Sequence, residues 1–567
     1  MLMDRVRISI DLCEPARQQL RVKLEWKPRV FHQSWLMPVW TPGSYTVRDH
    51  AQHLHSLRFQ QSGRVISAKR VAPSCWEAEL EDLDPVCLTY TLEARQLTVR
   101  TNHLDPDFAS LCLPAVVMLI NGERWNPHLL HLTLPTGWLE HLPLPRVDDG
   151  FEAKDFDHLV DTPIHAGPFH SRPFKVCGHH HELLTIGEPP MGWPPTFQAD
   201  IEAMCEAACT LMGTPPPAGD RYQLVIQLLD QGYGGLEHDH ASVLQFSWEA
   251  LTKKDGYRQL LQLIGHEYFH QWNVRRLRPG AYVPYRYDKA EISDGLWFAE
   301  GVTSYFDLTL SLLASKSDRQ TFLEDLGKDI SHVLLNPGYK IQSLADSSRE
   351  AWLRLYKQTP ANSLTQISYY RLGTVISFCL DVQLRQAGSA LSYVVRNLWQ
   401  SLGRHGKGYE PKDLIQAVAV RNKALAEVLP TWLETTMVAP IHDSLNALGL
   451  MAVPIHSQHA DVGMQLSKQK GRVLINKVSP GGPAEQAGLV PGDEVVGAHD
   501  WRLRGLEHWQ ALLQGPEQIP VLYARRGRLS STILKKKDPI VEHWEITWDP
   551  GASSSQKELR DRWFSIV

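Results

Sequence analysis

The hydrophobic period of this 567-residue chain changes twice along its length, which excludes both a single sheet and a single helical bundle. In the first 170 residues, polar and apolar side chains alternate over short stretches between Pro, Gly and Asp, as in half-buried strands. From about residue 245 the apolar positions recur at helical spacing, and alternation returns around residues 440–460. The pattern predicts a multidomain α+β protein. The alternating stretches include 5–12, 20–26 and 87–92.

Shifts in composition give the predicted domain boundaries. A segment rich in Pro, Asp and Gly at 143–173 ends an N-terminal β domain, 1–170, and a mainly helical domain spans 171–450. A β domain follows at 451–540, and the polar residues 541–567 are expected to form a loosely attached tail. The helical domain is expected to hold one strand, Tyr222–Leu229, and helices over 256–277, 294–314 and 367–385, the second of them capped by Ser293 and Asp294.

Composition narrows the class of protein. The chain is 43% hydrophobic and 21% charged, as in ordinary globular proteins, and its formal charge of −5 gives no case for nucleic acid as a partner. It has no apolar run long enough to span a membrane and no apolar signal core at its start, so we expect a cytoplasmic protein. Its eight scattered cysteines, without a Cys-x-x-Cys pair, indicate reduced thiols.

The strongest local motif is His266-Glu267-Tyr268-Phe269-His270. On a helix, positions i and i+4 share one face, so both imidazoles can reach the same metal ion, with Glu267 beside it. The chain contains 26 histidines, so two ordinary helix histidines remain the alternative.

A hydrolytic zinc site needs a third protein ligand and an open position. Glu300, in the apolar stretch Leu296-Trp297-Phe298-Ala299-Glu300-Gly301, is the candidate, because a carboxylate buried among aromatic residues needs a partner. The alternative is that Glu300 faces solvent. Two histidines and one glutamate suit Zn²⁺ by ligand type and charge.

These motifs resemble the M61 family of zinc metallopeptidases, the glycyl aminopeptidase family, which is similar to the M1 aminopeptidases and belongs to the gluzincins. HEYFHQWN at 266–273 and LWFAEG at 296–301 carry the resemblance, together with WTPGSY at 40–45 and VRTN at 99–102. The stretch GRVLINKV…GGPAEQAGLVPGDEVV resembles a PDZ domain. The resemblance implies an N-terminal β domain, a thermolysin-like catalytic domain and a C-terminal PDZ-like domain.

The resemblance also implies roles for individual residues. His266, His270 and Glu300 match the family's ligands to one zinc ion per chain, and Glu267 matches its general base. Gly234, Gly235 and Glu237 resemble the strand on which M1 enzymes hold the substrate, where the glutamate binds the free α-amine. An ordinary loop carboxylate is the alternative for Glu237.

Tyr370 is similar to the superfamily's oxyanion donor in a Tyr-x-x-Gly element, with Tyr369 as the fallback and two core aromatics as the alternative. The element departs from the family pattern, because it carries Arg371 and Leu372 where a Lys often precedes the Gly. The inserted segment 275–293 lies between the zinc motifs, where it could line the substrate cleft or cover it.

The predicted function is a zinc-dependent aminopeptidase that acts on peptides with a free N-terminus and, by resemblance, on small first residues such as Gly or Ala. A PDZ-like domain binds C-terminal peptides, and Val462, Gly463 and Met464 resemble its carboxylate loop. Two rival interpretations remain: a peptide-binding scaffold with a vestigial zinc site, and a zinc endopeptidase.

Overall fold

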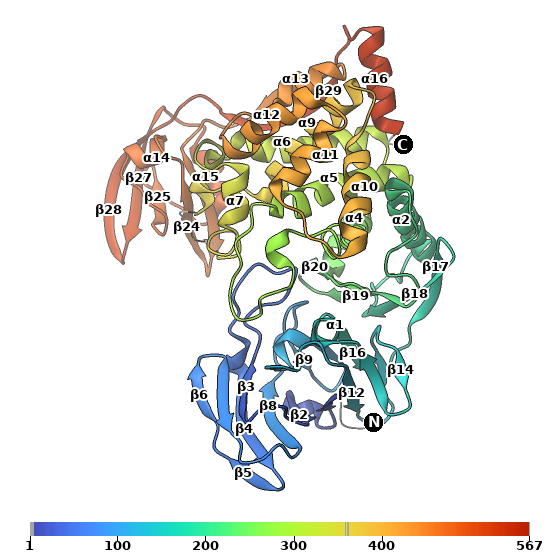
Figure 1. The fold of residues 1–567 in the computed structure, drawn as a ribbon. Coiled ribbons are helices and arrows are strands. Elements are labelled where there is room, and N and C mark those ends of the chain that lie inside the picture. The colour runs from blue at the N-terminus through green and yellow to red at the C-terminus, as the bar shows by residue number, and fades with distance from the viewer. Residues whose placement is uncertain (1–4, 358, 360–361, 566–567) are drawn as a thin grey trace.

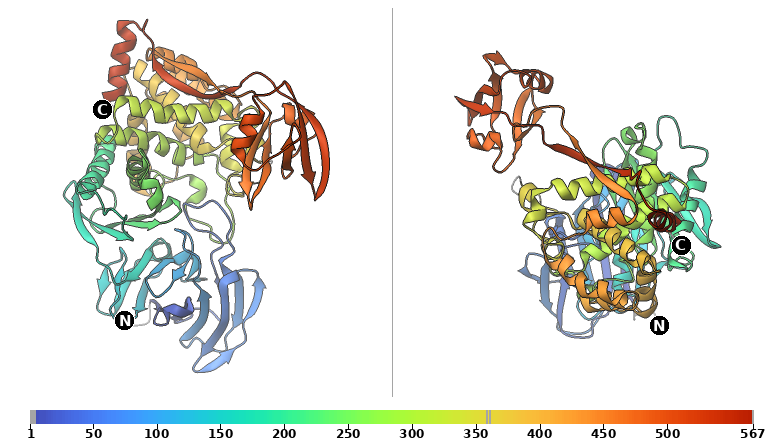
Figure 2. Two further views of the ribbon diagram at one scale, coloured as in Figure 1. Left: turned by 180° about the vertical axis from the view of Figure 1, so that it is seen from behind. Right: turned by 90° about the horizontal axis from the view of Figure 1, so that it is seen from above.

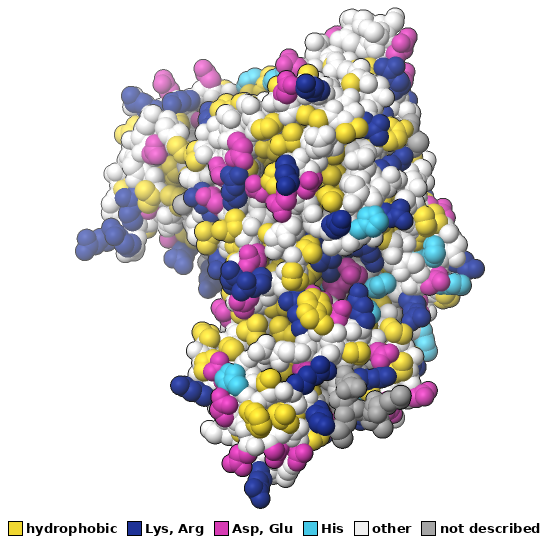
Figure 3. All heavy atoms as spheres, in the orientation of Figure 1, with side chains coloured by type: hydrophobic (Ala, Val, Ile, Leu, Met, Phe, Trp, Pro, Cys, Tyr) yellow, Lys and Arg dark blue, Asp and Glu magenta, His cyan; other side chains and the backbone are white. Residues whose placement is uncertain are grey.

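The computed structural model describes residues 5–357, 359 and 362–565. The chain forms an N-terminal β domain, a helical domain that contains one sheet, and a smaller C-terminal β domain beside the helices (Figure 1). Figure 2 shows the small domain extending away from the helical domain when the molecule is seen from above. Acidic and basic side chains are interspersed on the face drawn in Figure 3, in keeping with the small net charge.

The N-terminal domain is built from an eight-stranded sheet and two four-stranded sheets. In the largest sheet, β1 (Val6–Asp11) runs parallel to β12 (His128–Thr133) and antiparallel to β2 (Gln19–Trp26). The next strand is β8 (Val86–Glu93), which pairs antiparallel with β2. Every second residue of β1, β2 and β8 is buried, because side chains of a strand alternate between its two faces. The three alternating stretches of the sequence are therefore strands.

A five-stranded sheet separates the N-terminal domain from the helices (Figure 1). Its strands β18 (His179–Ile186), β19 (Tyr222–Leu229) and β21 (Ala241–Ser247) are parallel, and β19 is buried on both faces over most of its length. The last strand, β20 (Tyr233–Glu237), pairs antiparallel with β21 and lies at the edge of the sheet. Its outer edge has no partner strand within the described part of the chain.

The helix that carries the two histidines, α4 (Gly256–Phe269), ends earlier than predicted. The chain continues in turns, although Trp272 and Leu277 stay fully buried. The helical period was therefore misread past the end of the helix, because burial in a turn produced the same apolar pattern. The prediction of a helix over 256–277 is corrected to Gly256–Phe269.

The second predicted helix, 294–314, is divided into a π-helix, Trp297–Gly301, and α5 (Val302–Leu313). Ser293 and Asp294 do not cap it: Ser293 accepts from the Gly295 amide, and Asp294 pairs with Arg349 instead. A π-helical turn is rare and occurs often at functional sites. The third predicted helix is α9 (Tyr369–Gln386), which packs against both the π-helix and α5.

The C-terminal β domain has its own hydrophobic core and a sheet in the order β23-β24-β25-β27-β28. Its edge strand, β23 (Met464–Gln469), pairs with β24 (Arg472–Val478) and lies near the helix α15 (Leu506–Leu512). The other strands are β25 (Glu494–Ala498), β27 (Gln518–Arg525) and β28 (Arg528–Lys535).

The expectation of a loosely attached C-terminal tail is wrong. Strand β29 (Val541–Trp548) returns from the small domain and pairs with β22 (Leu450–His456), next to helix α6 (Arg319–Leu335). Helix α16 (Ser554–Ser565) then buries Trp563, whose indole donates to the Tyr305 hydroxyl at 2.9 Å. The segment after residue 540 is polar on average, but a few large apolar residues in it are buried and anchor it to the helical domain. None of the helices in the described ranges is long and apolar enough to cross a membrane.

Candidate active site

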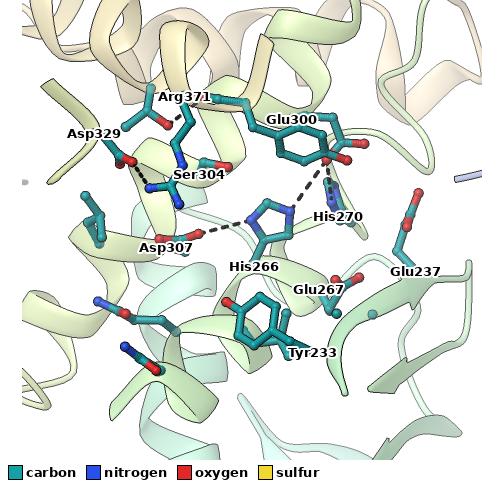
Figure 4. A pocket seen from close by; sticks show the side chains of 18 of the residues that line it. Tyr233, Glu237, His266, Glu267, His270, Glu300, Ser304, Asp307, Asp329 and Arg371 are labelled. Carbon is teal, nitrogen blue, oxygen red and sulfur yellow. Dashed lines mark hydrogen bonds and ion pairs between the residues drawn. The ribbon is translucent and has the colours of Figure 1, made fainter. Parts of the chain in front are cut away.

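The two histidines and Glu300 come together where α4 meets the π-helix. His266 Nε2 lies 3.5 Å from Glu300 Oε2, and His270 Nε2 lies 3.3 Å from the same oxygen. One ligand atom from each residue lies within 4.8 Å of the others, and Glu300 and His270 are almost fully buried. Figure 4 shows both rings turned toward Glu300. The alternative of a solvent-facing Glu300 is therefore wrong, and the two histidines lie where they could share a metal ion with it.

The other nitrogen of each ring is held by a second partner. His266 Nδ1 lies 3.0 Å from Asp307 Oδ2 on α5, and His270 Nδ1 donates to the Asn273 carbonyl at 2.7 Å. These contacts leave both Nε2 atoms free to bind a metal ion, as in zinc sites where an outer partner fixes the histidine tautomer. The sequence analysis missed Asp307. The sequence feature that could have indicated Asp307 is its position two helical turns after Glu300, on the same face of the helix.

Glu267 points from α4 toward the edge strand β20. Its side chain is buried, its Oε2 has no hydrogen-bond partner among the described residues, and burial raises the pKa of its carboxyl. A Cβ at Gly235 would lie 2.3 Å from Glu267 Oε1, so only glycine lets the strand come this close. Gly234, at φ +135°, precedes it on the open edge.

Glu237 ends the same strand. It is 4% exposed, and its Oε1 has no hydrogen-bond partner in the described structure. A Cβ at Gly43 would lie 2.5 Å from this oxygen, so the N-terminal domain abuts the carboxylate. Arg100, also from that domain, donates to the Gly235 carbonyl at 2.8 Å. The N-terminal motifs at 40–45 and 99–102 thus both reach β20.

The two candidate tyrosines differ in exposure to the cavity. Tyr369 is fully buried, whereas Tyr370 is partly buried and lines the cavity, with its ring centroid 6.5 Å from that of His266. Both hydroxyls lie 3.1 Å from the Tyr356 hydroxyl. The geometry therefore favours Tyr370 over Tyr369 as the donor to a reacting group.

The candidate metal ligands border one cavity of about 530 Å³, together with Glu237, Glu267 and Tyr370. The cavity extends from Gly43 past His266 to Asp329. The inserted segment 275–293 is fully described and contributes nothing to this lining. Its Arg275 instead pairs with Asp161 at 2.7 Å and with Asp239 at 3.0 Å. His238, the residue after Glu237, also contacts Asp161, at 3.2 Å, and lies outside this cavity.

In the C-terminal β domain, Val462, Gly463 and Met464 lead into the edge strand β23. Gly463 has φ +64°, and a Cβ there would lie 2.9 Å from the Pro483 nitrogen. The Ala484 amide donates to the Val462 carbonyl at 3.1 Å. These contacts fix the loop against α14 (Pro483–Gln486), at the end of the open sheet edge.

Comparison with known families matches three parts of the chain. The M61 peptidase N-terminal domain matches residues 7–168, the M61 glycyl aminopeptidase matches residues 259–376, and a PDZ domain matches residues 474–525. Two of the three matching models are therefore domains of M61 peptidases. The chain is a metallopeptidase, and the predicted order of β domain, helical peptidase domain and PDZ domain is confirmed.

Solved structures share the fold of this chain. An aminopeptidase N family protein from Idiomarina loihiensis is 24% identical, covers 99% of this chain and 100% of its own, and has a TM-score of 0.91. An M1 zinc metallopeptidase from Deinococcus radiodurans is 14% identical over 77% of this chain and 95% of its own, with a TM-score of 0.50. A mutant of that enzyme was solved with a Tyr-Ser-Ala substrate. None of the curated proteins compared with the chain matches it.

Proposed function

We propose that this metallopeptidase is a zinc aminopeptidase that removes single N-terminal residues, small ones such as Gly or Ala, from peptides. The observation that best supports the proposal is the Glu237 carboxylate, which is buried with one oxygen unpaired. A buried carboxylate without a partner is costly, and the protonated α-amine of a peptide provides both the charge and the donors. Ligand atoms of Glu237, Glu267 and His270 lie within 4.8 Å of one another, which favours a cation there.

His266, His270 and Glu300 would hold the zinc ion. Two imidazoles and one carboxylate form a donor set of catalytic zinc sites, and the Nδ1 contacts keep both Nε2 atoms available. When bound, the ion supplies Lewis acidity, which polarises a carbonyl and makes water more acidic. Neighbouring solved M1 zinc metallopeptidases have the same fold, which supports this choice of metal.

The protein groups around the metal then have separate tasks. Glu267 would take a proton from the attacking water and return it to the leaving amine, as general acid–base residues do. The Tyr370 hydroxyl would donate a hydrogen bond to the oxyanion that develops on the carbonyl. Glu237 would hold the α-amine, and the open edge of β20 would align the peptide backbone.

The end of the cavity at Glu237 supports an exopeptidase over an endopeptidase. Gly43 approaches Glu237 from the N-terminal domain, and Arg100 occupies the outward carbonyl of Gly235. A peptide with further residues on the N-terminal side of the first one would collide with Gly43 and Arg100. The same crowding supports a small first residue.

The proposal is tested on zinc-loaded protein with glycyl, alanyl and leucyl arylamides and with matched free and N-acetylated peptides. We expect turnover of free-amine Gly and Ala substrates, loss with chelator and recovery with zinc. Glu237→Gln should lower kcat/KM by about 100-fold, because it removes one side of a buried charge pair. The exposed Glu188→Gln serves as a control. Cleavage of acetylated peptides alone would replace the proposal with an endopeptidase, and no turnover with zinc bound would favour a scaffold.

We also propose that the PDZ domain binds the C-terminal carboxylate of a peptide partner at Val462, Gly463 and Met464. The open edge of β23 next to α15 supports it, since peptides add to such an edge as a further strand. Fluorescent peptides with free and amidated C-termini test the proposal. Equal binding of the two forms would contradict a carboxylate site.

A further inference from the structure

The cavity continues beyond the metal ligands to a region with its own charged side chains. Figure 4 shows Arg371 and Asp329 on the opposite side of His266 from Glu237, with Tyr233 below His266. Tyr233 begins β20, four residues before Glu237, and Arg371 follows Tyr370 on α9. Tyr233, Lys328 and Arg371 all line the cavity.

Charges at this end of the cavity are paired. Asp325 and Asp329 are buried, whereas the side chains of their partners Lys328 and Arg371 are 55% and 51% exposed. Lys328 Nζ lies 2.8 Å from Asp325, and Arg371 Nη1 pairs with Asp329. Both acids and both bases border the cavity, and each acid holds its more exposed partner in place. The half-exposed guanidinium of Arg371 has N–H donors that Asp329 does not use, and two parallel N–H groups of a guanidinium can bind both oxygens of a carboxylate.

The length of β20 relates this region to a bound peptide. A strand advances about 3.3 Å per residue, so Tyr233 lies about 13 Å along the edge from Glu237. An extended tripeptide spans about 10 Å by the same rise, and hydrogen bonds of about 3 Å at both ends extend its reach to about 16 Å, which is more than the length of this edge. A peptide whose amine is held at Glu237 would thus bring its third residue to Tyr233 and Arg371.

We propose that Arg371, assisted by Tyr233 and Lys328, binds a peptide carboxylate on the leaving-group side of the scissile bond. This inference rests on the proposed aminopeptidase function and deepens it, because it names a feature of the substrate beyond its first residue: a carboxylate on the leaving-group side. The carboxylate can be the C-terminus of a tripeptide or an acidic side chain within the first residues after the cleaved bond. Arg371 is a specificity-determining residue in this view, and it takes no part in bond cleavage.

The test compares kcat/KM for three substrates at low salt: Gly-Ala-Ala, its C-terminal amide, and Gly-Glu-Ala amide. We expect the free acid to be cleaved about tenfold better than the amide, as a charge-assisted hydrogen bond predicts. In Arg371→Gln the acid-to-amide ratio should fall to about one, and Arg371→Lys should keep part of the preference. If Gly-Glu-Ala amide is cleaved faster than Gly-Ala-Ala amide, the site accepts the carboxylate of a side chain. If the two amides are cleaved equally slowly, the site recognises the C-terminal carboxylate.

Two variants serve as controls. Arg371→Gln leaves Asp329 buried without its cation, so the double variant Arg371→Gln/Asp329→Asn separates a folding defect from lost recognition. The exposed Arg404→Gln should keep the wild-type ratio. Equal cleavage of Gly-Ala-Ala, its amide and Gly-Glu-Ala amide by the wild type, or an unchanged preference in Arg371→Gln, would overturn the subsite.

A binding measurement distinguishes this failure from failure of the proposed function. Zinc-loaded Glu267→Gln protein is titrated with Gly-Ala-Ala, its amide and Gly-Glu-Ala amide, in calorimetry that needs no turnover. Binding of either peptide with a carboxylate about tenfold tighter than Gly-Ala-Ala amide, lost when Arg371→Gln is added, supports the subsite even where the wild type cleaves none of the three. Equal binding of all three peptides rejects the subsite.

Discussion

Four acids around the cavity have the same functional group and different surroundings. Burial opposes the ionisation of Glu300, but His270 and His266 more than offset it and hold its pKa below the usual range. Glu267 lacks such a partner for its Oε2, and burial raises its pKa. Asp307 is engaged by His266, and Glu237 keeps one unpaired oxygen. These surroundings of single residues are what support the separate roles that we propose for the four acids.

Glu267→Gln should keep zinc and lose most turnover, by about 10²- to 10⁴-fold in kcat, the range that general acid–base catalysis contributes. The amide has nearly the same shape and cannot take a proton. Zinc content and kcat, measured on the same sample, check the prediction. Wild-type turnover with zinc bound would contradict the proposed base.

Asp307→Asn should weaken zinc binding or activity by about 10- to 100-fold, as loss of an outer partner of a metal-bound histidine does. The neutral amide is a weaker acceptor for His266 Nδ1 and permits the other ring tautomer. Competition with a chelating dye measures the zinc affinity. Asp329→Asn, in the same cavity and without contact to His266, is the matched control.

At the scale of elements, the site depends on the close crossing of the π-helix and α9. A Cβ at Gly301 would lie 2.5 Å from the Gly373 Cα, and a Cβ at Gly373 would lie 2.8 Å from the Gly301 Cα. The two backbones therefore touch where Glu300 and Tyr370 are carried. The Gly of the Tyr-x-x-Gly element is required for packing, since no larger residue fits between the helices.

Gly373→Ala should destabilise the protein by about 1–3 kcal/mol through overpacking, and should lower zinc affinity by moving Glu300. Thermal unfolding and zinc titration measure the two effects. Gly327→Ala is the matched control: it is also a buried helical glycine, but a Cβ there would meet its nearest neighbour at an ordinary 3.5 Å. That control should be neutral or stabilising, because alanine favours helices. Equal effects of the two changes would reject the crossing as the cause.

At the scale of the whole molecule, the cleft is complete only when the domains assemble. The N-terminal domain adds Gly43 and Arg100 to the end of β20, and the C-terminal segment packs α16 onto the helices from the opposite direction (Figure 1). The PDZ domain is joined to the helical domain by the paired strands β22 and β29. Arg100 and Gly43 therefore make the N-terminal domain part of the Glu237 end of the cavity, where we propose that the α-amine binds.

Gly43→Ala should raise KM for free-amine substrates by about tenfold or more, because its Cβ would displace the Glu237 carboxylate. The matched control is Gly63→Ala, at a similar φ of +80° but with nothing within 4 Å. Both changes carry the same backbone strain, and only the first meets the anchor. A common KM for the two variants would show that strain alone is responsible.

Local pattern by itself determined the strands of the N-terminal domain, the helix with His266 and His270, and the order of the three domains. These features follow from side-chain period and motif spacing, which are properties of neighbouring residues. Only the tertiary structure decided the early end of α4, the anchored C-terminal segment, and the choice of Tyr370 over Tyr369 at the cavity. It also brought Asp307, Gly43 and Arg371 to the cleft. Such contacts join residues far apart in the chain, and burial in a turn or a helix leaves the same apolar pattern.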